Sequence, residues 1–116
     1  MSRGPQQRIE DILRAIEKCE RYLRAIDDTP GLVEMVEDAI ERNLQIIGEA
    51  ASQLPLEIID AHPEIAWPQI RGFRNTLVHQ YFGVDIEIVR DVVEMHLPRL
   101  ADALQPYRVG AESDER

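Results

Sequence analysis

The chain has 116 residues, 44% of them hydrophobic and 30% charged, which predicts one domain with a buried core that needs no cross-links. Cys19 is the only cysteine, which excludes an internal disulfide and a cysteine-based metal site. No apolar run is long enough for a membrane span or a secretory signal. We therefore expect a cytoplasmic protein. The formal net charge of -9 excludes the broad basic surface of a non-specific nucleic-acid binder.

The first predicted helix runs from about Pro5, a favourable first-turn residue, to about Asp27. It ends at the turn-forming run Asp27-Asp28-Thr29-Pro30-Gly31. Its apolar residues repeat at helical spacing and are Ile9, Ile12, Leu13, Ile16, Leu23 and Ile26.

The second predicted helix covers about Leu32 to Leu54 and is apolar on two neighbouring rows. The main row steps by three and four residues and comprises Val33, Val36, Ile40, Leu44, Ile47, Ala51 and Leu54. The row beside it comprises Met35, Ala39, Ile46 and Ala50. A helix this broadly apolar lies at the centre of a bundle or pairs with another chain, and both can hold at once.

Three further helices are expected, at Leu56–Asp60, from about Trp67 to about Tyr81, and after Asp85, which can cap the last one. Pro98 lies inside the last helix and should kink it or divide it in two, because proline lacks the amide hydrogen and clashes with the preceding turn.

Residues 109–116 are polar and acidic, and we expect them to form a short disordered tail. Neither strand-like alternation nor an internal repeat occurs in the sequence. The sequence therefore predicts an all-α antiparallel bundle of about five helices, formed by residues 1–108.

The fourth predicted helix carries several polar and charged side chains on one side. On a helical wheel Tyr81 lies almost directly above Arg74, with Arg71 in the next sector, while Asn75 and His79 stand side by side one turn apart. Ile70, Phe73 and Leu77 occupy the opposite flank as core anchors. Two arginines, an amide, an imidazole and a phenol are thus predicted beside a packed apolar face.

These groups suit metal-free RNA cleavage, in which a 2′-hydroxyl attacks the adjacent phosphate. Arginine can hold a phosphate in two contacts and stabilise charge on its oxygens, and Arg71 could also bind substrate. His79 can transfer protons near neutral pH, and Asn75 could orient His79 or bind the substrate. The reaction needs both a base and an acid, which a two-fold homodimer would supply.

A structural interpretation of the same residues stays open. Buried arginine or asparagine is common where helices meet, and a lone histidine is more often structural than catalytic. Lys18 is the only lysine among 13 basic residues, so any contact with RNA should use a local arginine site or a basic partner.

The run Arg74-Asn75-Thr76-Leu77-Val78-His79-Gln80-Tyr81 resembles the Arg-x4-His-x-Tyr signature of HepT-like toxins, helical ribonucleases of the HEPN superfamily. The stretch 41–50 resembles the second helix of that family, and 62–67 resembles the turn before its motif helix. Asn75 matches the polar residue that the superfamily favours directly after the arginine.

The resemblance implies a HEPN-like fold and a two-fold homodimer that acts as a metal-independent ribonuclease, with Arg74, Asn75 and His79 as catalytic residues in a shared cleft and no cofactor. It also implies a type VII-like toxin–antitoxin pair, in which an MntA-like nucleotidyltransferase antitoxin attaches AMP to Tyr81. The added bulk and negative charge would block RNA. The alternative is a non-catalytic helical subunit that binds nucleotide or a nucleotidyltransferase partner.

The remaining histidines do not predict a metal site, because they are scattered along the chain. His62 is expected to face solvent or cap a helix, and His96 to pack near the apolar side of the last helix. Trp67 is expected to anchor the start of the fourth helix. Arg42 and Asn43, on the second helix, could line a dimer cleft or bond to the fourth helix.

Overall fold

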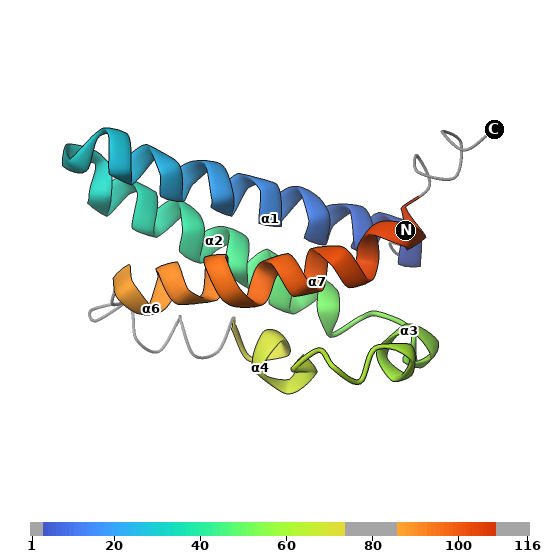
Figure 1. Cartoon of the computed structure of the whole chain (residues 1–116). Coiled ribbons are helices and arrows are strands. Elements are labelled where there is room, and N and C mark those ends of the chain that lie inside the picture. Colours follow the sequence, from blue (N-terminus) through green and yellow to red (C-terminus); the bar gives the residue numbers. More distant parts are fainter. Residues whose placement is uncertain (1–3, 74–85, 109–116) are drawn as a thin grey trace.

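The computed structural model describes residues 4–73 and 86–108, and all regular structure within these ranges is helical (Figure 1). The helices α1 (Pro5–Asp28) and α2 (Val33–Ala51) form a long hairpin. The C-terminal helical run lies along both of them, and of the two short helices that follow α2, the second, α4, packs against it. The predicted all-α antiparallel bundle is confirmed.

Helix α1 begins and ends where the sequence predicts. Pro5 occupies the first turn, and the side chain of Gln7 accepts a hydrogen bond of 3.2 Å from the amide of Gly4, which precedes the helix. At the other end the amide of Thr29 bonds to the carbonyl of Ala25 at 2.9 Å, and the 3-10 turn η1 (Pro30–Leu32) leads into α2. All six apolar residues predicted to face the core of this helix are buried.

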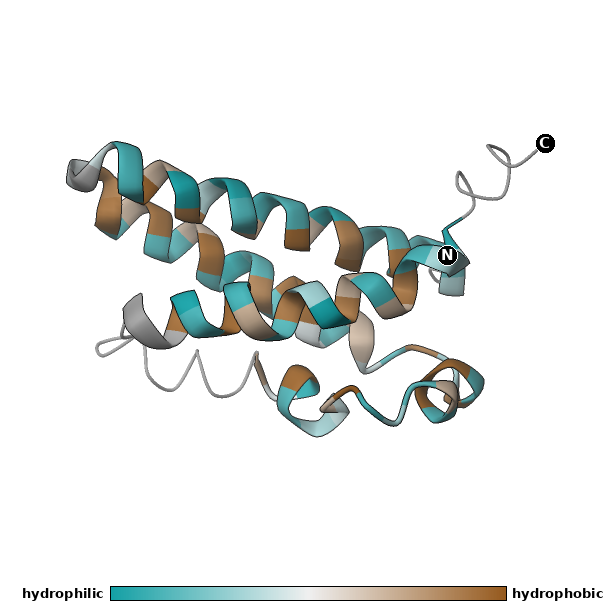
Figure 2. Ribbon diagram, in the orientation of Figure 1, coloured by the Kyte–Doolittle hydropathy of each residue, from teal (hydrophilic) through white to brown (hydrophobic). Residues whose placement is uncertain are grey.

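Helix α2 buries the main row of its predicted apolar residues, with only Val33 half-buried. The second row is divided. Ala50 is buried within the chain, Ala39 and Ile46 are half-buried, and the side chain of Met35 is 69% exposed. Figure 2 shows hydrophobic segments of α1 turned toward the other helices and hydrophilic ones on its outer side.

The C-terminal run consists of α6 (Ile86–Asp91), the π-helical turn η2 (Val92–His96), α7 (Leu97–Leu104) and the 3-10 turn η3 (Gln105–Tyr107). The predicted division near Pro98 is confirmed. In the π turn the amide of Leu97 bonds to the carbonyl of Val92, five residues earlier. Pro98 then falls in the first turn of α7, where its missing amide hydrogen costs little.

Two short helices, α3 (Leu56–Ala61) and α4 (Trp67–Arg71), follow α2. Ile58, Ile65, Trp67 and Ile70 are buried and join the core formed by α1, α2 and the C-terminal run. The predicted helix from Trp67 to Tyr81 is confirmed for its first turn, and α4 ends at Arg71 with Gly72 as its C-cap. Residues 74–81 lie outside the described residues, as do Asp85 and the predicted tail at 109–116.

One predicted position is wrong. His96 was expected to pack near the apolar side of the last helix, but it is exposed. A π turn takes more residues per turn than an α-helix, so its side chains do not follow the α-helical wheel on which the expectation was based. None of the helices in the described part of the chain is both long and apolar enough to cross a membrane.

Candidate functional site

Four of the predicted site residues, Arg74, Asn75, His79 and Tyr81, lie outside the described residues. Arg71 is the only predicted site residue that the structure describes. The arrangement that the sequence predicts therefore stays a prediction. The structure does describe α4, the helix that precedes the motif segment, and the contacts that hold α4 in place.

The start of α4 is anchored by Trp67, as predicted. Its side chain is 4% exposed, and its Nε1 donates a hydrogen bond of 3.0 Å to the carbonyl of His62. Pro68 occupies the first turn, and the amide of Ile70 bonds to the carbonyl of Ala66 at 3.1 Å. A buried, hydrogen-bonded indole at the start of a short helix fixes the direction in which the chain continues.

The two faces of α4 divide as the sequence predicts. Ile70 is buried and Phe73 is half-buried against the core, while Arg71 is exposed at the end of the helix. No hydrogen bond or ion pair joins Arg71 to another residue of the described ranges. Its guanidinium is therefore available to an anion approaching this side of the bundle.

Gly72 follows α4 in a helical conformation, with φ of -79°. Its amide bonds to the carbonyl of Pro68 at 3.0 Å, and a Cβ atom added there would lie 3.2 Å from that same oxygen. This spacing is tighter than ordinary van der Waals contact, so the backbone turns closely at the point where α4 gives way to the motif segment.

Arg42 and Asn43 are neighbours on α2, but Asn43 is buried and Arg42 is exposed. Asn43 is the only buried polar side chain among the described residues, at 6% exposure, and its Nδ2 donates a 2.8 Å hydrogen bond to the carbonyl of Ala39. This bond stays within α2. Arg42 is exposed and lines a hollow of about 240 Å³ between α1 and α2, together with Arg8, Asp11, Gln45, Ile46, Glu49 and Ala50.

A hydrogen-bonded cluster that the sequence did not predict supports the segment before α4. His62 is the C-cap residue of α3, which confirms one of its two expected roles. Its side chain is 20% exposed, so it is half-buried and does not face solvent. Its Nε2 lies 3.1 Å from the hydroxyl of Tyr107, and its Nδ1 lies 3.3 Å from a carboxylate oxygen of Glu64. The two rings meet edge to face, with centroids 5.7 Å apart. A residue 45 positions away thus holds the turn before α4.

Acidic, histidine and cysteine side chains in the described ranges form no group of three or more that could hold a metal ion. Cys19 is fully buried in α1, and burial raises the pKa of its thiol to about 12. The described part of the chain therefore presents neither a metal site nor a reactive thiolate.

Comparison with known proteins identifies the family. Residues 12–106 match the family described as Ribonuclease HepT-like, a span that runs from α1 to η3 and includes the motif segment. The chain belongs to the HepT-like ribonuclease family. The resemblance drawn from the Arg-x4-His-x-Tyr motif is confirmed.

Relatives in this family extend over nearly the whole chain. A protein of Thermococcus cleftensis, named "Probable ribonuclease HepT", is 35% identical over 93% of this chain and 99% of its own length. A protein of Caldanaerobacter subterraneus subsp. tengcongensis, named provisionally as an RNase, is 33% identical over 83% of this chain and 87% of its own length. No solved structure matches this chain significantly.

Proposed function

We propose that this HepT-like chain is a cytoplasmic endoribonuclease toxin that cleaves RNA without a metal ion. The observation that carries the proposal is the motif Arg74-x4-His79-x-Tyr81, which falls inside the span matched by the ribonuclease family. The names of the two relatives describe ribonucleases. Arg71, exposed at the end of α4 and three residues before Arg74 in the sequence, offers a second guanidinium.

The proposed reaction is an internal displacement at phosphorus. The 2′-oxygen of one nucleotide attacks the adjacent phosphorus while a neutral His79 removes the hydroxyl proton. The bond from phosphorus to the 5′-oxygen breaks, and a protonated histidine gives that oxygen a proton. The products are a 2′,3′-cyclic phosphate and a 5′-hydroxyl. Arg74 stabilises the negative charge on the phosphate oxygens, and Asn75 orients His79 or the substrate.

A base and an acid are needed at the same time, and one chain offers one histidine in the motif. We therefore propose a two-fold homodimer in which each subunit supplies Arg74 and His79 to a common cleft. The outer side of α2 supports a second copy, because Met35 is largely exposed and Ala39 and Ile46 are covered only in part by the chain itself. A monomer in light scattering at micromolar concentration contradicts this arrangement.

Control of the toxin is proposed to reside in Tyr81. An MntA-like nucleotidyltransferase antitoxin would transfer AMP from ATP to the phenol oxygen, with pyrophosphate as leaving group. On the helix that the sequence predicts for residues 74–81, the adduct would place a phosphate and a nucleoside about two turns from Arg74, nearly in line with it. Tyr81→Phe should remain toxic and escape modification, whereas an adduct on Tyr22 or Tyr107 would show that Tyr81 is not the acceptor.

The experiment that separates a ribonuclease from a non-catalytic binding subunit is the variant His79→Ala. Proton transfer requires the imidazole, but simple phosphate binding does not. His79→Ala should abolish RNA cleavage and toxicity while leaving the circular dichroism spectrum and the complex with the antitoxin unchanged. Cleavage at the wild-type rate by His79→Ala would reject the proposed mechanism.

A further inference from the structure

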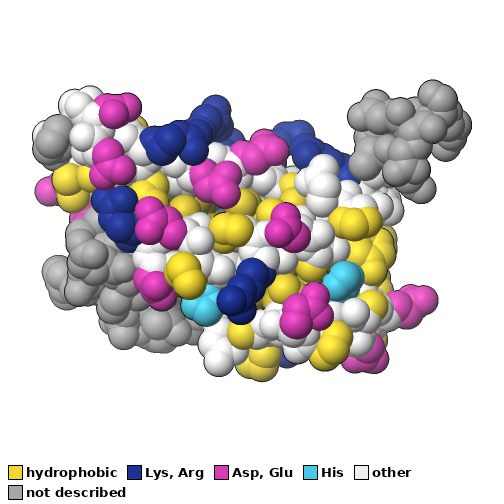
Figure 3. All heavy atoms as spheres, viewed as in Figure 1, with side chains coloured by type: hydrophobic (Ala, Val, Ile, Leu, Met, Phe, Trp, Pro, Cys, Tyr) yellow, Lys and Arg dark blue, Asp and Glu magenta, His cyan; other side chains and the backbone are white. Residues whose placement is uncertain are grey.

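The surface of α1 is more basic than its sequence suggests. The helix carries five of the 13 basic residues of the chain and six acidic ones, so its sequence reads as an evenly mixed charged face. In Figure 3 basic side chains gather along the upper edge of the molecule, where α1 lies. The surface differs from the sequence in charge because arginines from outside α1 bind several of its acidic side chains.

Two arginines of the C-terminal run neutralise acids on one flank of α1. Arg108 binds Glu10 with two hydrogen bonds, of 2.9 and 2.7 Å, and its Nη1 lies 3.8 Å from Glu17. Arg90 donates a 3.1 Å hydrogen bond to Asp27. Three of the six acids of α1 are therefore engaged by arginines from outside the helix, which adds two positive charges to this flank.

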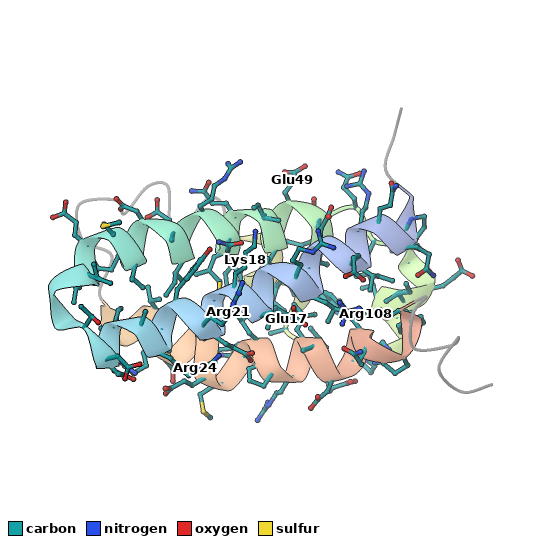
Figure 4. All side chains as sticks on the ribbon, turned by 90° about the horizontal axis from the view of Figure 1, so that it is seen from above. Glu17, Lys18, Arg21, Arg24, Glu49 and Arg108 are labelled. Atoms are coloured by element: carbon teal, nitrogen blue, oxygen red, sulfur yellow. The ribbon has the colours of Figure 1, made fainter. Side chains whose placement is uncertain are left out.

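Of the five cations of α1, Arg14 lies 3.6 Å from Glu10 and Arg8 lines the hollow between α1 and α2. The other three are Lys18, Arg21 and Arg24, defined here as the α1 cation row. They follow one another at three-residue steps, so the row extends roughly 9 Å along the axis. Figure 4 shows them crossing the outer face of α1 obliquely, from the side of α2 toward the C-terminal run. None of the three makes a hydrogen bond or ion pair with another described residue.

The composition of this face favours a phosphate backbone over a protein partner. Protein interfaces are anchored by large apolar or aromatic side chains at their centre. The exposed large hydrophobic residues of the described chain lie elsewhere, at Leu32, Met35, Leu56 and Met95. A row of cations without an apolar anchor suits a polyanion, whose backbone is bound through charge and arginine forks.

We propose that the α1 cation row binds the backbone of an RNA chain as a second and sequence-independent contact, on the side of the bundle opposite α4. This inference rests on the proposed ribonuclease function. In Figure 1 α1 and α4 lie on opposite sides of the bundle, which measures 31 Å across its shorter axes. A short oligonucleotide therefore cannot contact α1 and the side of α4 at the same time, so the row strengthens binding at the site only for long RNA.

The test compares Lys18→Gln/Arg21→Gln/Arg24→Gln with wild type and with Arg99→Gln, which removes an exposed arginine of α7 that has no ion pair in the described chain. The probe is a fluorescent 2′-O-methyl RNA long enough to cross the molecule, which cannot be cleaved by attack of a 2′-hydroxyl. A trinucleotide of the same chemistry serves as the short ligand. Binding is measured by anisotropy over a range of salt concentrations.

The triple variant should bind the long RNA at least tenfold more weakly at low salt. The slope of log affinity against log salt should fall by about 2, since each single-strand phosphate contact contributes roughly 0.7. Its affinity for the trinucleotide, and that of Arg99→Gln for both ligands, should equal wild type. An unchanged affinity and slope for long RNA, or an equal loss with Arg99→Gln, would overturn the proposal.

Cleavage of ordinary RNA separates this inference from the proposed function. If wild type binds long RNA through the row but cleaves none, the row stands as an RNA-binding surface and the ribonuclease proposal fails. If wild type cleaves RNA and the row variant binds as tightly as wild type, the row is not an RNA contact. Loss of antitoxin binding alone in the row variant would mark the row as a protein contact and would likewise overturn the proposal.

Discussion

Arg108 holds Glu10 from the opposite end of the chain, with its Nε and one Nη donating to the two carboxylate oxygens at 2.9 and 2.7 Å. The hydrogen bonds from Arg108 lower the pKa of Glu10 from its usual value of 4.5, and its positive charge acts in the same direction. The pair ties the end of the C-terminal run to the first turns of α1, and so closes the bundle.

Glu10→Gln should lower the free energy of unfolding by about 0.5–1 kcal/mol at neutral pH, because the pair is only partly shielded from solvent. Since the folded pKa of Glu10 is depressed, its contribution is complete above 4.5 and is lost as the pH falls through the lower folded value. Urea unfolding at several pH values measures the difference. A gap between the two proteins that widens on acidification would contradict this account, and Glu57→Gln, on exposed α3, is the control.

Tyr107→Phe should destabilise the protein by about 1 kcal/mol, because it removes the 3.1 Å hydrogen bond to His62 and leaves the ring contact in place. The matched control is Tyr22→Phe, since Tyr22 is half-buried in α1 and its hydroxyl has no hydrogen bond to another described residue. Unfolding midpoints of the two variants should differ. Equal midpoints would show that the hydrogen bond does not stabilise the turn before α4.

Cys19 should resist thiol reagents in the folded protein. Its side chain is inaccessible, and burial raises its pKa to about 12, so hardly any thiolate exists at neutral pH. Reaction with a chromogenic disulfide should be slow in buffer and become rapid when denaturant crosses the unfolding midpoint. Rapid native labelling would mean that α1 separates readily from the rest of the bundle.

Arg74→Lys should reduce RNA cleavage on the order of 100-fold, because a single ammonium cannot reproduce two aligned contacts to the phosphate. The comparison is with Arg99→Lys, which changes an exposed arginine of α7 in the same way and should cleave at the wild-type rate. If lysine at position 74 supports full activity, the guanidinium fork has no part in the reaction.

The helices that the sequence predicts well are those with local signals. Pro5 and the Thr29-Pro30-Gly31 turn delimit α1, and the three-and-four spacing of its apolar residues identifies the buried face. The division at Pro98 follows from the chemistry of proline, but the π turn before it does not. Val93 and Leu97 are buried on either side of that turn, at a four-residue step that an ordinary α-helix would also bury, so the apolar pattern does not reveal the π turn.

Contacts between distant parts of the chain were not predictable in the same way. Arg108 pairs with Glu10 across 98 positions, and Tyr107 reaches His62 across 45, so no helical spacing connects them. The types and order of the motif residues identify them, not their geometry. Arg71, which precedes the motif, is the only predicted site residue with a described position, at the exposed end of α4.

The most direct measurement of the central claim is the chemistry of the RNA ends produced by the purified wild-type protein, freed of its antitoxin, in excess EDTA. The proposed mechanism predicts cleavage that persists in the chelator and leaves 2′,3′-cyclic phosphate and 5′-hydroxyl ends, with no cleavage by His79→Ala under the same conditions. Cleavage that stops in EDTA and returns with a divalent metal, or that leaves 5′-phosphate ends, would contradict it.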